Sequence, residues 1–181
     1  VELERFADAK TIMHQLPNKK ANFVKGRIMH LNKKYGTAST LFKQSFEGDF
    51  TCNDVIILFN YIRASQFAED YDQMSQAIDM GEKFLAKYRN HIGITRIANR
   101  TVNCLWQKFR LAKTKSEEET CLQKMIEITD DQQHANRADW TLVRNKSVAY
   151  RKWGKLDQAL VAIDESFGYL KKKQKDYDIK Y

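Results

Sequence analysis

The feature that most constrains this chain is how seldom proline and glycine interrupt it. One proline and seven glycines are spread over 181 residues, so long stretches contain no residue that ends a helix. A β-sandwich would need turn signals roughly every 8–12 residues. The sequence therefore predicts an all-α chain.

Apolar and small residues recur at three- and four-residue steps through most of the sequence, which is the spacing of one face of a helix. The periodic run from Asn22 stops at Tyr35-Gly36, and the run from Ala38 stops at Gly48-Asp49. This pattern, two helical runs separated by a short break, recurs three more times along the sequence. It predicts helical hairpins over residues 19–50, 51–89, 92–130 and 135–168.

Residues 1–16 and 169–181 are predicted to form flanking helices, so that residues 1–181 make up a single domain. The chain opens inside a helical pattern without an initiator methionine, and we expect it to be a piece of a longer protein. Two helix starts carry the pattern of a capping box, in which a hydroxyl and an acid satisfy free backbone amides: Thr51 with Asp54, and Ser116 with Glu119.

The fourth hairpin places small and bulky residues at fixed steps: Ser147, Tyr150, Ala159, Ile163 and Ser166. The first hairpin repeats most of this spacing with Gly26, Ala38, Phe42 and Ser45, and the second hairpin keeps it with Ile62, Met74, Ile78 and Gly81. This arrangement resembles the tetratricopeptide repeat (TPR) superfamily. The resemblance implies a superhelical array of antiparallel helical hairpins, an α-solenoid, whose first helices line a concave groove where partners bind.

The repeats are long and degenerate. Equivalent second-helix positions lie 36, 47 and 38 residues apart, at Ala38, Met74, Cys121 and Ala159. The usual TPR unit has about 34 residues. The chain is in this respect similar to the longer repeats of bacterial peptide-sensing regulators and of regulatory regions in large signalling ATPases.

No catalytic motif is visible: the sequence has no glycine-rich phosphate loop, HExxH, GxSxG or DxDxDG pattern. Cys52, Cys104 and Cys121 lack CxxC spacing and form no ligand cluster with histidine. We therefore expect no enzyme activity from this chain, no cofactor and no metal. Separate, reduced cysteines favour a cytoplasmic setting, and no 18-residue apolar run predicts a membrane span.

Polar residues on the first helices of the hairpins are the candidate partner-binding residues. Asn amides can form hydrogen bonds with the backbone of an extended peptide, and Arg can form a bidentate ion pair with a carboxylate. Arg27 and His30 lie on a comparable face of the first hairpin. The predicted partner-binding residues are Asn60, Arg63, Arg96, Asn99, Arg100, Asn103, Trp106, Arg144 and Asn145.

The leading functional hypothesis is a protein-interaction module, a scaffold or regulatory domain that binds an acidic protein or peptide segment in a concave groove. The net charge of +8 and pI near 9.3 also allow a nucleic acid in that groove, which is the first alternative. A regulatory or oligomerisation segment of a larger enzyme or transcription regulator is the second. The sequence does not determine the oligomeric state.

Overall fold

A computed structural model describes residues 17–46 and 51–178, whose regular secondary structure consists of helices joined by short turns. These residues contain no β-strand, which confirms the all-α prediction. The α-helices of the described residues are α2 (Asn18–Leu31), α3 (Tyr35–Lys43), α4 (Val55–Ala68), α5 (Tyr71–Lys87), α6 (Ile94–Leu111), α7 (Lys115–His134), α8 (Trp140–Lys152) and α9 (Leu156–Asp178), with a 3₁₀ turn η1 (Cys52–Asp54) before α4.

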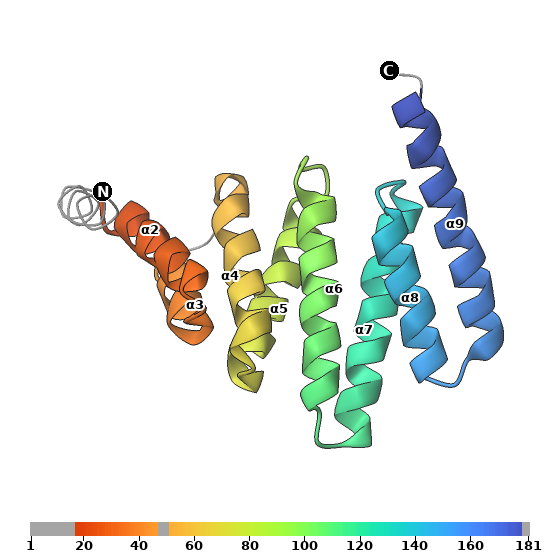
Figure 1. Cartoon of the computed structure of the whole chain (residues 1–181), viewed down its shortest axis with the longest axis horizontal. Coiled ribbons are helices and arrows are strands. Elements are labelled where there is room, and N and C mark those ends of the chain that lie inside the picture. The colour runs from red at the N-terminus through yellow and green to blue at the C-terminus, as the bar shows by residue number, and fades with distance from the viewer. Residues whose placement is uncertain (1–16, 47–50, 179–181) are drawn as a thin grey trace.

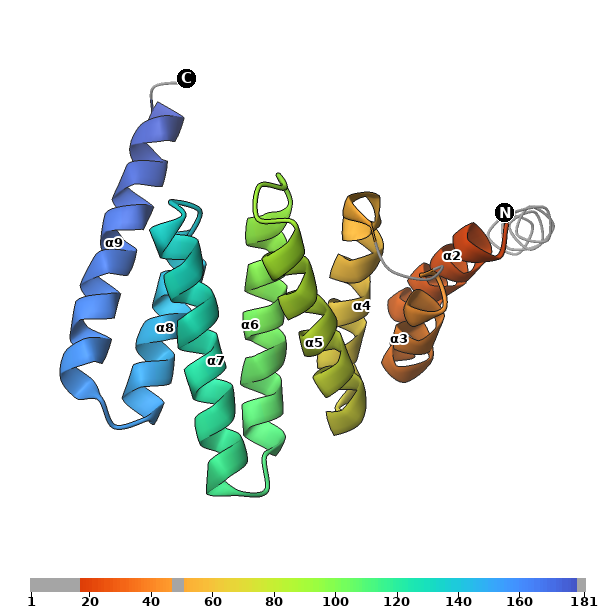
Figure 2. The same ribbon diagram turned by 180° about the vertical axis from the view of Figure 1, so that it is seen from behind.

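The helices stand side by side in chain order, with α2 and α9 at opposite ends of the row (Figures 1 and 2). We call α2, α4, α6 and α8 the first helices and α3, α5, α7 and α9 the second helices. Contacts link α2 to α4, α4 to α6 and α6 to α8, so the first helices form one continuous layer. This layer faces the viewer in Figure 1, and α3, α5 and α7 face the viewer in Figure 2.

Small residues set the distance between neighbouring helices. A Cβ added to Gly26 of α2 would lie 2.7 Å from Cε1 of Phe42 in α3, so only glycine lets these helices approach so closely. Gly81 of α5 likewise has no room for a Cβ beside the hydroxyl of Thr101 in α6. In the last pair, the buried Ser147 hydroxyl donates to the carbonyl of Ala159 at 2.9 Å.

The capping box at Thr51 is confirmed: its backbone N–H donates to Oδ2 of Asp54 at 2.8 Å. The second predicted box is wrong. Thr114, two residues before Ser116, caps α7 and pairs with Glu117. The backbone amides of Lys113 and Thr114 hold this carboxylate, and they lower the pKa of Glu117.

The C-terminal boundary also differs from the expectation. The sequence predicts that the fourth hairpin ends at residue 168 and that a separate flanking helix covers 169–181, but α9 continues through Gly168 to Asp178. A Cβ added to Gly168 would meet no atom within 4 Å, so its lack of a side chain serves no close contact there. The predicted helix over residues 1–16 lies outside the described residues, as do residues 179–181. No helix of the described segments is both long and apolar enough to cross a membrane.

Candidate functional site

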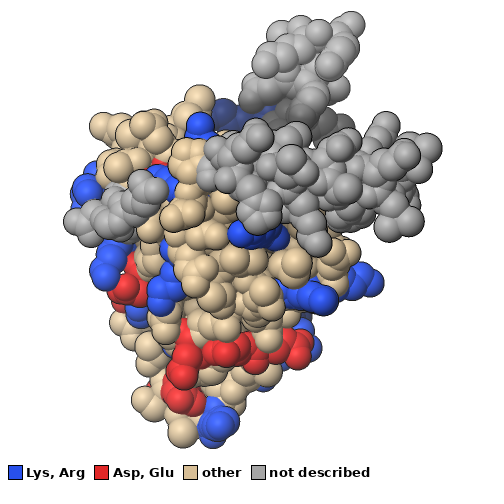
Figure 3. Space-filling model, turned by 90° about the vertical axis from the view of Figure 1, so that its left-hand side faces the viewer, with Lys and Arg blue, Asp and Glu red and all other residues tan. Residues whose placement is uncertain are grey.

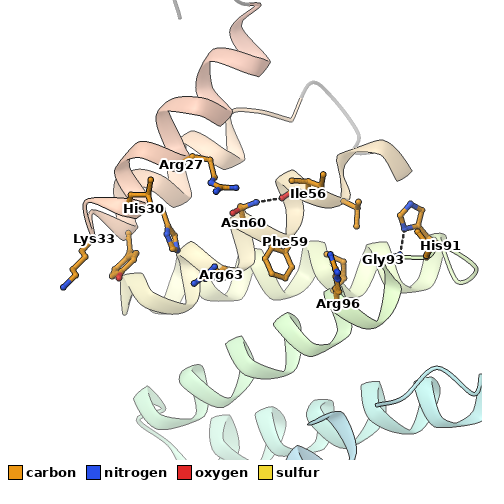
Figure 4. Close-up of a pocket in the computed structure, with 15 residues that line it drawn as sticks. Arg27, His30, Lys33, Ile56, Phe59, Asn60, Arg63, His91, Gly93 and Arg96 are labelled. Atoms are coloured by element: carbon orange, nitrogen blue, oxygen red, sulfur yellow. Dashed lines mark hydrogen bonds between the residues drawn. The ribbon is translucent and has the colours of Figure 1, made fainter. Parts of the chain in front are cut away.

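A hollow of about 850 Å³ opens between the first helices α2, α4 and α6. Arg27 and His30 extend into it from α2, and Phe59 and Arg63 line it from α4 (Figure 4). The turn before α6 adds His91, Ile92 and Gly93, and α6 itself adds Arg96 and Ile97. The remaining lining residues are Leu31, Lys33, Tyr35, Val55, Ile56 and Asn60.

A second hollow of about 340 Å³ continues toward α8, and it shares Phe59 and Arg96 with the first. Its other lining residues are Asn99, Arg100, Asn103 and Thr141. We call the two adjoining hollows the trough. Six of the nine predicted binding residues line it: Asn60, Arg63, Arg96, Asn99, Arg100 and Asn103.

Acidic residues are distributed unevenly between the two sets of helices. Asp and Glu are absent from all four first helices, although each holds at least one Lys or Arg. The carboxylates instead occur on α5, α7 and α9 and in the turns. Seen from the α2 end of the row, Asp and Glu gather in one band low in the view, while Lys and Arg are spread around it (Figure 3). The trough is therefore a basic surface.

Its arginines have no carboxylate partner among the described residues. No ion pair joins Arg27, Arg63, Arg96 or Arg100 to an Asp or Glu there. The Arg63 Nε is buried without a hydrogen-bond partner. Burial, and next the positive charge of Arg63, lower the pKa of Arg100, whose guanidinium carbon lies 4.7 Å from the centre of the Phe59 ring. The positive charges of these arginines therefore lie close together, and no Asp or Glu of the described residues pairs with them.

The pKa of His30 is affected by the same arginine charges. Burial lowers its pKa first, followed by the charges of Arg63, Arg27 and Arg100. Its Nε2 atom is buried without a partner, and its ring packs edge-on against Tyr35 and Phe67. The imidazole is therefore neutral near pH 7, and a bound anion would favour its protonation.

The asparagines of the trough are partly engaged within the fold. The Asn60 side chain donates to the carbonyl of Ile56 at 2.7 Å. Asn99 donates to Oδ2 of Asp139 at 2.9 Å, and the other oxygen of Asp139 caps α8 by accepting from Leu142 N. The Asn99 Oδ1 atom stays buried and unpartnered, so one acceptor of this amide is unused.

Asn103 and Asn145 make a further link between first helices. Nδ2 of Asn145 donates to Oδ1 of Asn103 at 3.3 Å, joining α8 to α6. Both side chains are partly exposed, and they retain one amide group each for another partner. These four asparagines accordingly have a structural role beside any role in binding.

The other predicted binding residues lie outside the lining of the trough. Arg144 is exposed on α8 and lies over the Trp140 ring, 5.5 Å from its centre. Trp106 stacks on Phe109 with ring centres 5.2 Å apart and packs against the core. The structure does not bring these two side chains together with the arginines of the first hollow.

Sequence reasoning missed the apolar part of the site. Ile56 and Phe59 belong to the apolar three- and four-residue period of this segment, yet Ile56 is 62% exposed and both line the trough. Ile92 lies in the turn before α6 and is 98% exposed. Because Ile92 lies between two periodic runs, the sequence pattern gave no indication that its side chain borders the trough.

No group of three or more His, Cys, Asp or Glu side chains within residues 17–46 and 51–178 could hold a metal ion. Cys104 is fully buried, and burial raises its pKa to about 12. Burial also raises the pKa of Cys121. These two thiols are core residues with no nucleophilic character near neutral pH.

Comparison of this chain with protein-family models, with curated proteins and with solved structures finds no match.

Proposed function

We propose that this chain is a TPR-like repeat module that binds an acidic, partly apolar segment of a protein or peptide in the trough. The observation that carries the proposal is the convergence of arginines from α2, α4 and α6 on one hollow without a carboxylate partner among the described residues. Bringing like charges together costs free energy unless an anion compensates them. A carboxylate-bearing segment supplies that compensation through charge-assisted hydrogen bonds.

The apolar lining supports a peptide as the ligand. Leu31 and Ile92, 74% and 98% exposed, border the same hollow as the arginines. Burying such side chains against a partner is favourable, at about 25 cal/mol per Å² of apolar surface. A segment with both carboxylates and apolar side chains complements both features, and the Nδ2 group of Asn103, which Asn145 leaves unused, can donate to its backbone carbonyls.

The repeat interpretation rests on the order of the helices and on their small residues. Hairpins follow one another along a row, and the first helices form a layer of their own. Gly26, Gly81 and Ser147 occupy small-residue positions of the TPR pattern, and each lies where two helices approach closely. In such an array the layer of first helices is the partner-binding side.

Nucleic acid is the competing ligand because the trough is basic. Single-stranded nucleic acid binds best where aromatic rings offer free faces for stacking. Here Arg100 covers Phe59, Phe109 stacks on Trp106 and Arg144 lies over Trp140. The exposed apolar side chains of the trough are aliphatic, which favours a peptide over a nucleic acid.

Fluorescence anisotropy with labelled peptides tests the proposal. The probes are a panel of peptides that combine Glu with Leu and Phe, and matched peptides with Gln in place of every Glu. We expect the acidic members alone to bind, and Arg27→Gln to weaken them about tenfold or more, the usual effect of removing one charge-assisted hydrogen bond. Lys25→Gln is the matched control, because Lys25 lies on the same helix but does not line the trough.

Equal binding of the Glu and Gln peptides, or equal losses in the two variants, would refute recognition of carboxylates in the trough. A labelled single-stranded RNA is measured in parallel. Tighter binding of RNA than of every peptide, lost in Arg27→Gln, would assign the trough to nucleic acid instead.

A further inference from the structure

The exposed large apolar side chains of the described residues fall mostly into two places. Leu31, Ile56 and Ile92 border the trough. Five others lie on α9 and are between 41% and 64% exposed: Leu156, Leu160, Val161, Phe167 and Leu170. The helix that carries more of them than any other is therefore at the far end of the row from α2 (Figure 1).

Four of these side chains, with the half-buried Ile163, form one stripe along α9. The positions 156, 160, 163, 167 and 170 are separated by alternating steps of four and three residues. This is the a/d spacing of a heptad repeat, by which one helix packs along another. We call these five residues the α9 seam.

The α9 seam is distinct from the face that packs on α8. That face consists of small, buried residues, Ala159, Ala162 and Ser166. The helix has 23 residues where α8 has 13, and it projects past the end of α8 (Figures 1 and 2). The C-terminal part of α9 therefore extends beyond the seam and past α8.

The corresponding residues of the first hairpin are covered by the next first helix, α4. Phe46, which follows α3 and corresponds to Phe167, packs against Tyr61 of α4 with ring centres 6.1 Å apart. Ser39, which corresponds to Leu160, bonds to Ser65 of α4 at 2.7 Å and is 1% exposed. In the first hairpin these positions are therefore packed against another helix, whereas in α9 they are large, apolar and exposed.

Charges beside the seam identify the partner. Asp157 and Asp164 lie on one flank of the seam in the N-terminal half of α9, and Lys171 lies on the same flank further along it. Glu165 lies on the far side of α9, where it accepts a hydrogen bond from Gln133 of α7. A second α9 running antiparallel would set the acidic half of each helix beside the basic half of the other. A parallel pair would set like charges together.

We propose that a second copy of this chain packs on the α9 seam, with the two α9 helices antiparallel about a two-fold axis near Ile163. In this register Leu156 faces Leu170 of the second copy, and Leu160 faces Phe167. Asp157 lies beside Lys171 of the other chain. The contact is isologous and closed, so it gives a dimer rather than a filament.

Sedimentation velocity of the full chain, from about one micromolar to several hundred micromolar, tests this proposal. We expect a concentration-dependent dimer, and we expect Leu160→Gln/Phe167→Gln to raise its Kd about tenfold or more by removing central apolar contacts. Both side chains are more than half exposed, so circular dichroism should show an unchanged helical content. Leu31→Gln/Ile92→Gln, which replaces two exposed apolar residues that border the trough, should leave the dimer intact.

Orientation is tested by exchanging charges. Asp157→Lys should weaken the dimer severalfold, and adding Lys171→Asp should restore it, since the pair is re-formed with opposite polarity. A wild-type chain that stays monomeric throughout would overturn the proposal, as would a dimer unaffected by Leu160→Gln/Phe167→Gln. Failure of the double charge exchange to restore the dimer would overturn the antiparallel arrangement.

Discussion

Arg63→Met is expected to raise the stability of the fold while it weakens partner binding. The Arg63 Nε is buried without a hydrogen-bond partner, and its charge lowers the pKa of both His30 and Arg100. A buried polar group left unpaired costs about 1–3 kcal/mol. Methionine keeps an unbranched apolar stem of similar shape, but it does not replace the packing of the guanidinium plane, which offsets part of the gain.

The net gain should be about 1 kcal/mol, which raises the Tm of a chain this size by about 2–4 °C. The affinity for an acidic peptide should fall in the same variant. One charge-assisted hydrogen bond to a carboxylate is worth about 1.5–3 kcal/mol, so the Kd for an acidic peptide should rise about tenfold to a hundredfold. Scanning calorimetry measures the first effect, and peptide anisotropy measures the second.

Lys25→Met serves as the control, because it removes one positive charge from α2 at an exposed position outside the trough. It should leave both the Tm and the Kd nearly unchanged. A fall in Tm together with the loss of affinity would identify Arg63 as a structural residue and refute the reasoning. An unchanged Kd would place the binding site elsewhere.

Three further outcomes follow from the geometry. Gly26→Ala should cost about 1–3 kcal/mol in urea unfolding, since its Cβ would meet the Phe42 ring at 2.7 Å and α2 must move away from α3. Asn99→Ala should cost about 1 kcal/mol, measured in the same way, because Asp139 at the N-terminus of α8 loses a hydrogen bond. Acidic-peptide binding should tighten as pH falls from about 7.5 to 5.5: the pKa of His30 is lowered in the free protein, and a bound carboxylate raises it, so binding takes up a proton. The free protein should lose stability over the same fall in pH, because the unfolded chain binds that proton more readily, and His30→Gln should flatten both profiles.

The helices could be predicted from the sequence because their signal is local. A three- and four-residue apolar period and a near absence of proline leave few alternatives to helix. Helix ends were less certain, since they depend on single side chains. Thr114 and Ser116 are each followed three residues later by Glu, and nothing in the pattern says which hydroxyl caps α7. Gly168 is read as a break, but an exposed glycine in a long helix costs only about 1 kcal/mol, which the packing of α9 on α8 outweighs.

The candidate binding residues could be predicted only to the level of a shared helix face. Asn and Arg on the first helices share a layer, and six of the predicted side chains line the trough. Which of them meet depends on how far apart neighbouring helices stand, and sequence spacing carries no information on that distance. Arg63 therefore lines the first hollow, whereas Arg144 lies outside the trough over Trp140.

The shape of the trough follows from a change in packing along the layer of first helices. Contact between α2 and α4 is sparse, whereas α4 and α6 pack closely along their length. The large hollow opens where α2 stands apart from α4, and the apolar residues around it, among them Ile56, are left in solvent. Closing that gap would bury them and stabilise the fold, yet it would also force Arg27 nearer to Arg63. Repulsion between the arginines therefore opposes closure of the gap. Under the proposed function, an acidic ligand that neutralises them would remove this cost, and we expect an acidic peptide without apolar side chains to bind far more weakly than one that supplies both.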